Sequence, residues 1–252
     1  MSIKEIEIHP GHWINPGSGA VGILNEVIEA RKIAKRVFGI LKASNVPCTY
    51  YEDNTSTNQR QNINYLVNQH NKDRDSLIVS IHLNSGGDSS KAIGTEVLYY
   101  DQQALAARIS KAISDATGGE LPNRGAKQRK DLGVLASTYE PAILIEVCFV
   151  NSVVDAVVYR RDFGKICYAI ATELAKHLGK TLKLTTQPKT ERKREETQMT
   201  NSLTSTAKED LRGLLKVTYQ KGILKVDHSD RVGSMTDGEA LGLLISVVKR
   251  TL

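Results

Sequence analysis

Apolar residues before Gly179 follow two alternating periods, and this alternation restricts the fold more than any other feature. Ile3–Ile8 alternates apolar and polar residues, as a half-buried strand does, whereas the apolar residues of Asn25–Lys42 have helical spacing. The later segments continue the alternation, with strands expected at 46–51, 76–81, 94–100, 131–135 and 142–146 and helices at 57–71, 102–116 and 161–178. Strands that alternate with helices predict an α/β domain with a twisted, mostly parallel sheet flanked by helices.

The character of the chain changes after Gly179. Residues 185–198 contain no apolar residue, so they cannot bury a core and are expected to form a charged, flexible linker. Apolar residues at helical spacing resume in two segments, around Leu211–Tyr219 and Leu241–Val248. We therefore expect a domain over residues 1–180, a linker over 181–203 and a small all-helical module over 204–252.

Charge, cysteine usage and the N-terminus limit the classes of protein that fit. The net charge of +6 favours anionic partners such as wall polymers, nucleic acid or a membrane surface, without choosing among them. The 3 cysteines form no CxxC pair, which indicates reduced, buried thiols. Residues 1–5 lead directly into a strand and no run of about 18 apolar residues occurs, so we expect synthesis in a cytoplasm without a signal peptide or membrane span.

Two histidines and one glutamate follow predicted strands. His12 lies in a Pro-Gly-His turn after the first strand, His82 ends the strand at 76–81, and Glu146 ends the strand at 142–146. Open α/β sheets place their sites at the carboxyl ends of strands, so these side chains could converge. Two imidazoles and one carboxylate would leave the fourth position of a zinc ion for water. Local spacing alone leaves ordinary surface roles open for all three residues.

Six short motifs occur in order along the domain. They are Pro10-Gly11-His12, Glu26 followed by Ile33-Ala34, Ser80-Ile81-His82-Leu83-Asn84, Gly94-Thr95-Glu96-Val97, Asn123-Arg124-Gly125-Ala126-Lys127 and Pro141-Ala142-Ile143-Leu144-Ile145-Glu146. This series resembles the zinc N-acetylmuramoyl-L-alanine amidases of the amidase-3 type, in particular the endolysins of phages of Gram-positive bacteria. The resemblance covers about residues 3–179.

The resemblance implies a reaction and assigns residues to it. His12, Glu26 and His82 match the ligands of one zinc ion per chain, and Glu146 matches the catalytic acid/base. The implied reaction is hydrolysis, by zinc-activated water, of the amide between N-acetylmuramic acid and L-alanine in peptidoglycan. Residue patterns alone do not single out Glu26, because carboxylates are common in the first turn of a helix.

Five further side chains have roles that the sequence leaves open. Arg124, a fork-shaped donor, could bind a carboxylate or the lactyl group of the substrate or lie at the surface, and Asn84 is a second candidate for substrate binding. His9 stands where the family usually has Asp, and it could orient a ligand or lie at the surface. Trp13 stands where the family usually has Gly and could shape a groove for the sugar. Cys148 is expected in the core rather than as a nucleophile.

The resemblance also implies a biological role. It indicates a phage lytic enzyme for host cell lysis, made in the host cytoplasm and released through a holin to the wall. A cellular autolysin for mother-cell lysis or cell separation has the same chemistry and remains an alternative. A non-catalytic wall-binding protein is the alternative of another class, but all four chemical positions are present. We do not expect nucleic-acid binding, because the second helix of the tail is basic only at its end, at Lys249 and Arg250.

The C-terminal module resembles one S-layer-homology repeat over about 45 residues, at 207–215, 221–224 and 235–241. Such repeats bind secondary cell-wall polymers, although this one lacks the usual aromatic residue near its start. A generic two-helix packing or oligomerisation unit is the alternative. A purine-rich stretch of codons before Met199 would permit internal initiation there, and the resulting free module could associate with the full chain and raise wall avidity.

Overall fold

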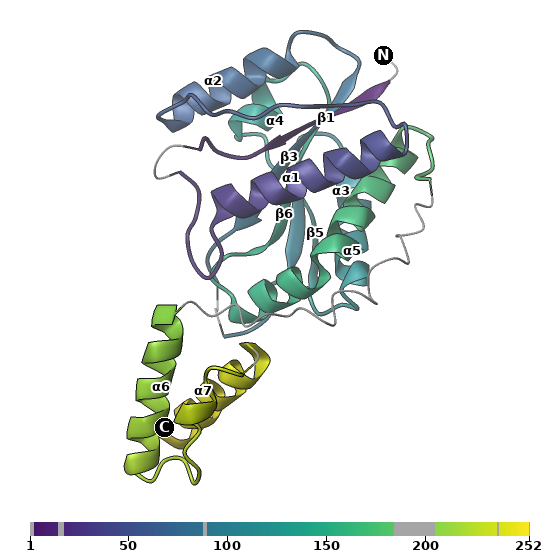
Figure 1. Cartoon of the computed structure of the whole chain (residues 1–252). Helices are drawn as coiled ribbons and strands as arrows, with labels where there is room; N and C mark the ends of the chain where they lie inside the picture. The colour runs from purple at the N-terminus through teal and green to yellow at the C-terminus, as the bar shows by residue number, and fades with distance from the viewer. Residues whose placement is uncertain (1–2, 15–17, 88–89, 184–204, 236, 252) are drawn as a thin grey trace. The chain divides into compact units, whose positions relative to one another are not determined.

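The computed structural model describes residues 3–14, 18–87, 90–183, 205–235 and 237–251 (Figure 1). The chain divides into two compact units, residues 1–184 and 185–252. Most of the predicted linker at 181–203 lies outside the described residues, as does Met199, so both remain predictions. Among the helices of the described ranges, none combines the length and the apolar character that a membrane span requires.

The first unit is built on one sheet of six strands. They are β1 (Glu5–Pro10), β2 (Cys48–Tyr50), β3 (Ser76–Asn84), β4 (Thr95–Tyr99), β5 (Asn123–Gln128) and β6 (Ala142–Phe149). Their order is β2-β1-β3-β6-β4-β5, and every pair is parallel except β4 with β6. The central strands β3 and β6 are nearly continuous apolar runs because both of their faces are covered. The predicted α/β fold with a mostly parallel sheet is confirmed.

Helices cover both faces of this sheet. They are α1 (Glu26–Ala43), α2 (Gln59–His70), α3 (Gln103–Ala116), α4 (Gly133–Ser137) and α5 (Val153–His177). Both α1 and α3 contact α5, and with it they cover the face that carries Val79 and Ile81 in the larger core (Figure 1). The helices α2 and α4 contact each other, and Leu135 of α4 packs with Ile78 and Leu144 in a smaller core. Since side chains alternate along a strand, His82 and Ile78 share the face of the smaller core.

Three elements differ from the prediction. The expected strand at 131–135 is the short helix α4, Gly133–Ser137. The edge strand β5 was not expected, because its residues carry almost no apolar pattern and are mostly exposed. Helix α5 begins at Val153 rather than at 161, capped by the Ser152 side chain, and non-helical backbone at Asp162 divides it. The exposed Val153, Val154 and Val157 obscure the helical spacing in its first part.

The second unit is helical, as predicted. Helix α6 (Ser205–Gln220), a 3-10 turn η2 (Ser229–Arg231) and helix α7 (Asp237–Thr251) surround a small core. The buried members of that core are Leu211, Leu215, Leu224, Val232, Met235, Ala240 and Val247. Fully burying one such Leu or Val side chain contributes about 1.5–3 kcal/mol to the free energy of unfolding. Since this core has far fewer buried residues than the larger core of the first unit, its total contribution is smaller.

A buried glutamate at the amino end of β6 gives the domain a pH-dependent stability. Glu140 is 6% exposed, and its Oε1 accepts a hydrogen bond of 2.6 Å from the Ser76 backbone. Its Oε2 is buried without a partner among the described residues. Burial, together with the nearby carboxylates of Glu7, Asp73 and Asp75, raises the pKa of Glu140 to about 7. Folding therefore favours the protonated form of this side chain.

We expect Glu140→Gln to stabilise the protein at pH 8 but not at pH 4. The pKa of Glu140 is higher in the folded protein than its unfolded value of about 4.5, so protonation of Glu140 stabilises the fold. This contribution is complete below a pH of about 4.5 and is lost as the pH rises through about 7. The uncharged amide avoids that loss, so the gain at pH 8 should be roughly 1–3 kcal/mol. Urea unfolding of both proteins at the two pH values measures it. An equal effect at both values would contradict this account of Glu140.

Candidate functional site

Three side chains from distant parts of the chain meet at the carboxyl end of the sheet. His12 follows β1, Glu26 is the first residue of α1, and His82 lies near the end of β3. Glu26 Oε1 lies 3.0 Å from His12 Nε2 and 2.9 Å from His82 Nδ1. One potential ligand atom of each residue lies within 4.8 Å of the other two. The structure thus brings together the three residues predicted as metal ligands.

The turn before His12 depends on a glycine. The backbone of His12 is left-handed, with φ of 66°, which a residue other than glycine rarely adopts. At Gly11, a Cβ would lie 2.1 Å from Cε1 of the His82 ring and 2.3 Å from its Nε2. The His82 imidazole therefore occupies the space that any side chain at position 11 would need.

We expect Gly11→Ala to disturb the candidate metal site far more than the size of the added methyl group suggests. The added methyl group overlaps the His82 ring, so the ring or the turn that carries His12 must move. Outer-shell changes that reorient a ligand typically weaken metal affinity about 10- to 100-fold. Zinc affinity measured by chelator competition tests this. Gly39→Ala is the control, because a Cβ there meets nothing within 4 Å. Equal affinities in the two variants would contradict the expectation.

Backbone donors and the two imidazoles hold Glu26 in its ionised form. The backbone N–H of Ala20 donates to Oε2 at 2.7 Å, and that of Leu83 donates to Oε1 at 3.3 Å. Burial alone would raise the pKa of Glu26, but the hydrogen bonds and charges of His12 and His82 outweigh it and hold the pKa far below its usual range. Burial lowers the pKa of His82, which favours the neutral imidazole that a metal needs.

Glu146 lies beside His82 on the next strand. It is the register partner of His82 in the β3–β6 pair and of Glu96 in the β4–β6 pair. Its Oε2 is buried without a partner among the described residues. Burial, and next the negative charges of Glu26 and Glu96, raise the pKa of Glu146 to about 8. A carboxyl group with a pKa close to neutral can both accept and release a proton, as acid/base chemistry requires.

The two predicted substrate-binding residues meet at a third side chain, Glu96. Asn84 Nδ2 donates to Glu96 Oε1 at 3.0 Å, and Arg124 Nε donates to Glu96 Oε2 at 2.6 Å. Lys127 Nζ lies 3.0 Å from the same oxygen, and the Arg124 guanidinium lies 5.1 Å from the centre of the Phe149 ring. Glu96 thus fixes one end of each side chain next to Glu146.

Glu96 received no role from the sequence, although it stands in one of the six motifs. The available signal was a glutamate within an otherwise apolar strand, since such a residue is seldom buried without partners. Two of its three partners, Arg124 and Lys127, come from β5, the strand that the apolar pattern did not reveal. Glu96 is buried and paired, whereas Arg124 remains partly exposed at 36% of its side-chain area.

Two residues that depart from the family pattern are buried. His9 is fully buried, so its surface alternative is wrong. Its Nδ1 lies 2.7 Å from His70 Nε2, and His70 Nδ1 lies 2.6 Å from Glu7 Oε2. Trp13 is 8% exposed and therefore offers little ring surface to a sugar. Burial, and next the charges of His70 and His82, lower the pKa of His9 well below its usual value.

The cysteines behave as the sequence predicted. Cys48, Cys148 and Cys167 are all free and buried. Burial, and next the charge of Asp155, raise the pKa of the Cys148 thiol well above its usual value. A thiol held in this form is a poor nucleophile, so its predicted place in the core is confirmed.

Other groups of carboxylates within the described ranges do not resemble a zinc site. Two clusters at the amino ends of the strands combine Asp73 with Glu5 and Glu7, or with Asp75 and Glu140. Both offer oxygen atoms only, whereas zinc in proteins is usually bound through nitrogen or sulfur in addition to oxygen. Of the candidate groups found, His12, Glu26 and His82 alone include imidazoles.

Comparison with known sequences identifies a family that matches most of the first unit. Residues 6–178 match the family model described as N-acetylmuramoyl-L-alanine amidase, Amidase_3. Two uncharacterized proteins of Clostridium perfringens are 33% identical over 163 residues and 31% identical over 185 residues. These matches cover 62% and 71% of this chain and 47% and 53% of the relatives. The chain therefore spans about half the length of the curated relatives that it matches.

Solved structures share the fold. The catalytic domain of an endolysin targeting Clostridia Difficile has a TM-score of 0.62 and 24% identity, over 71% of this chain and 99% of that one. The catalytic domain of CwlV, an N-acetylmuramoyl-L-alanine amidase from Bacillus (Paenibacillus) polymyxa var. colistinus, has a TM-score of 0.57 and 28% identity, with the same coverage of both chains. An amidase of Nostoc punctiforme has a TM-score of 0.59 and 25% identity, over 71% of this chain and 100% of its own.

Proposed function

Because the chain belongs to the Amidase_3 family of N-acetylmuramoyl-L-alanine amidases, we propose that it hydrolyses the amide between N-acetylmuramic acid and L-alanine in peptidoglycan. The observation that carries this proposal is the meeting of His12, Glu26 and His82, with Glu146 in register beside His82. Similarity to the amidase CwlV supports the same substrate.

The donor set fits a zinc ion. Two imidazole nitrogens and one carboxylate oxygen are typical ligands of catalytic zinc, and they leave a fourth position for water or substrate. The three donors already lie close together, and the low pKa of Glu26 supplies the ionised carboxylate that a cation requires. We propose that His12, Glu26 and His82 hold one zinc ion per chain. When bound, zinc would polarise the scissile carbonyl and make the attacking water more acidic.

The remaining groups of the site would orient the substrate and move protons. Glu146 would accept a proton from the attacking water and deliver it to the nitrogen of the departing L-alanine. Its placement between His82 and Glu96 supports this role, since burial, and next the charges of Glu26 and Glu96, favour the protonated form of Glu146. Arg124 and Asn84, held by Glu96, would bind the polar groups of the lactyl-peptide portion.

We further propose that the enzyme acts as a phage endolysin in host cell lysis. It would be synthesised in the host cytoplasm and reach the wall after release. The endolysin catalytic domain among the similar structures supports this proposal through its fold. A cellular autolysin would have the same site and is the alternative, and the similar N-acetylmuramoyl-L-alanine amidase of Nostoc punctiforme supports the shared chemistry of both roles. The neighbouring genes distinguish the two, because an endolysin gene is expected beside a holin gene.

The helical second unit is proposed to bind the wall or to oligomerise. Secondary cell-wall polymers are the candidate ligands, and self-association, including with a fragment initiated at Met199, is the other candidate. Met199 lies outside the described residues. Mass analysis of the recombinant protein tests the fragment, because silencing Met199 should remove a band that begins there.

Metal analysis combined with product analysis tests the proposed reaction. The purified protein should contain about one zinc per chain, and digestion of Gram-positive walls should release new N-terminal L-alanine without new reducing sugar ends. A chelator should abolish release, and added zinc should restore it. New reducing ends without free L-alanine would indicate a glycosidase and overturn the proposal. Zinc-loaded protein that binds walls but releases nothing would favour a non-catalytic wall-binding protein.

A further inference from the structure

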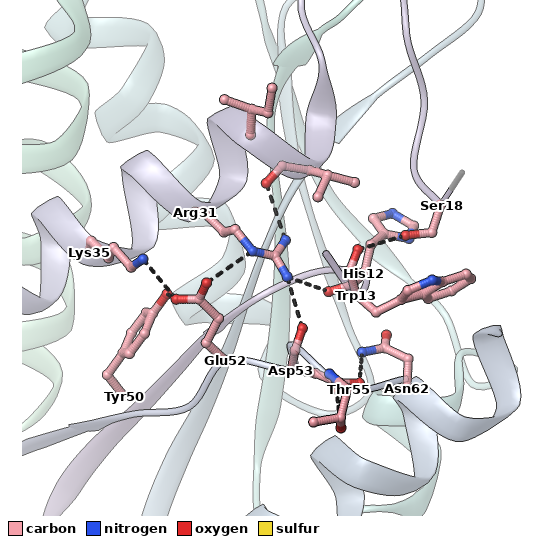
Figure 2. Close-up of polar contacts among 12 residues, drawn as sticks. His12, Trp13, Ser18, Arg31, Lys35, Tyr50, Glu52, Asp53, Thr55 and Asn62 are labelled. Atoms are coloured by element: carbon pink, nitrogen blue, oxygen red, sulfur yellow. Dashed lines mark hydrogen bonds and ion pairs between the residues drawn. The ribbon is translucent and has the colours of Figure 1, made fainter. Parts of the chain in front are cut away.

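Arg31 is a buried cation whose contacts converge behind the metal site. It lies on α1, is 7% exposed, and stands at the centre of a polar network (Figure 2). One terminal nitrogen, Nη2, donates to the backbone carbonyl of His12 at 3.3 Å and to that of Asp53 at 3.1 Å. The other, Nη1, donates to the carbonyl of Val27 at 3.2 Å. Arg31 therefore joins the turn of His12, the helix of Glu26 and the segment after β2.

The positive charge of the Arg31 guanidinium is compensated by the carboxylate of Glu52, on the side away from the carbonyl groups. Arg31 Nε donates to Glu52 Oε1 at 3.1 Å, and Lys35 Nζ and Tyr50 Oη contact Glu52 Oε2 at 2.9 and 2.7 Å (Figure 2). A guanidinium remains charged when buried and presents its donors in a fixed plane. The ion pair with Glu52 fixes that plane, so that the terminal nitrogens face the three carbonyl groups.

The segment that carries Asp53 is rigidly built. Asp53 Oδ1 accepts hydrogen bonds from the backbones of Thr55 and Ser56, each at 3.0 Å. Asp53 Oδ2 accepts one from Asn62 Nδ2 of α2 at 2.8 Å (Figure 2). The carbonyl of Asp53 is thus a fixed point, and Arg31 connects it to the carbonyl of His12.

The contact with His12 matters because its backbone is strained. Left-handed backbone at a residue other than glycine persists only where surrounding contacts hold it. The imidazole of His12 must stay at Glu26, and the same helix that begins with Glu26 carries Arg31 one and a half turns later. Helix α1 therefore provides both the candidate ligand Glu26 and the side chain, Arg31, that holds the backbone of the candidate ligand His12.

We propose that Arg31 is a positioning residue for the metal site, which holds the His12 turn so that the three donors stay together. The inference rests on the proposed function only in taking zinc as the ion. Arg31 contacts the backbone of His12 rather than its ring, so it acts on geometry and not as a ligand. Lysine cannot replace it fully, because one ammonium group cannot span Glu52 and three carbonyls.

Three substitutions and one control test this. Arg31→Met keeps the apolar stem and removes every donor, while Arg31→Lys keeps the charge. Arg36→Met is the matched control, since Arg36 is exposed on the same helix. Glu52→Gln keeps Arg31 but weakens the ion pair that fixes the plane of its guanidinium. We expect zinc affinity of the folded protein to fall about 10- to 100-fold in Arg31→Met and less in Arg31→Lys. Glu52→Gln should lower the affinity less than Arg31→Met does, and the control Arg36→Met should retain affinity close to wild type.

Zinc affinity by chelator competition is read together with the melting temperature of the metal-free protein. A residue that only stabilises the fold would lower the melting temperature of Arg31→Met but leave the zinc affinity of its folded form unchanged, and that result would overturn the inference. Should Arg31→Met fail to fold, Arg31→Lys decides by the same comparison. Wild-type protein that binds no zinc would instead refute the proposed function, and this inference with it.

Discussion

Glu146→Gln is expected to lower kcat for release of L-alanine from peptidoglycan by about 100- to 10,000-fold, the range for loss of a general acid/base. Glutamine keeps the size of the side chain and cannot move a proton at neutral pH. The pKa of Glu146 is raised to about 8 by burial and by Glu26 and Glu96, so the wild-type carboxyl group can both accept and release a proton near neutral pH. The measurement is the initial rate of amine release from purified walls.

The Glu146→Gln variant must retain its metal and its fold for this result to be informative. Zinc content should match the wild type, because Glu146 is not one of the three grouped donors, and the melting temperature should be no lower. Glu209→Gln, at an exposed glutamate of α6, is a control for the loss of one negative charge. A Glu146→Gln enzyme with more than about one tenth of wild-type kcat would refute the acid/base role.

His82→Ala is expected to abolish stoichiometric zinc binding and to reduce activity by at least about 1,000-fold, since a Lewis acid contributes several kcal/mol. The change leaves Glu26 with one imidazole contact, from His12 at 3.0 Å. It also opens space over Gly11, so the turn of His12 loses a packing partner. Zinc per chain after dialysis, and the rate on purified walls, measure the two effects.

His177→Ala near the end of α5 is the matched histidine control and should keep full zinc content. Excess zinc should not restore His82→Ala to wild-type activity at concentrations that saturate the native protein. A His82→Ala protein with one tightly bound zinc and normal turnover would exclude the ligand set His12, Glu26 and His82. It would direct attention to the carboxylate clusters at the opposite edge of the sheet.

The strands β1, β3 and β6 could be predicted from the sequence because they have strong apolar patterns, although β3 and β6 continue to Asn84 and Phe149, past their predicted ends at 81 and 146. Their register then brings His82 and Glu146 side by side, as parallel strands require. Glu26 could not be found from pattern alone, since its role depends on where the start of α1 lies relative to β3. That relation is set by the turn at Gly11 and His12, whose left-handed backbone has no signal in apolar spacing.

The contacts of Glu96 and Arg31 were beyond sequence reasoning for a different reason. Glu96 joins β3 to β5 through Asn84 and Arg124, and β5 has no apolar pattern that would place it beside β4. Arg31 binds backbone carbonyls, which every residue possesses, so no residue type marks its partners. Local patterns predict the layers of this domain, but the bonds between loops depend on the assembled sheet.

Every side chain assigned here to chemistry or substrate binding belongs to the unit of residues 1–184. The helical unit contributes none of them, so we expect the proposed chemistry to survive the exchange of this unit for another. A chimaera that joins residues 1–184 to a different wall-targeting module should inherit the bond specificity of this chain and the host range of its new partner.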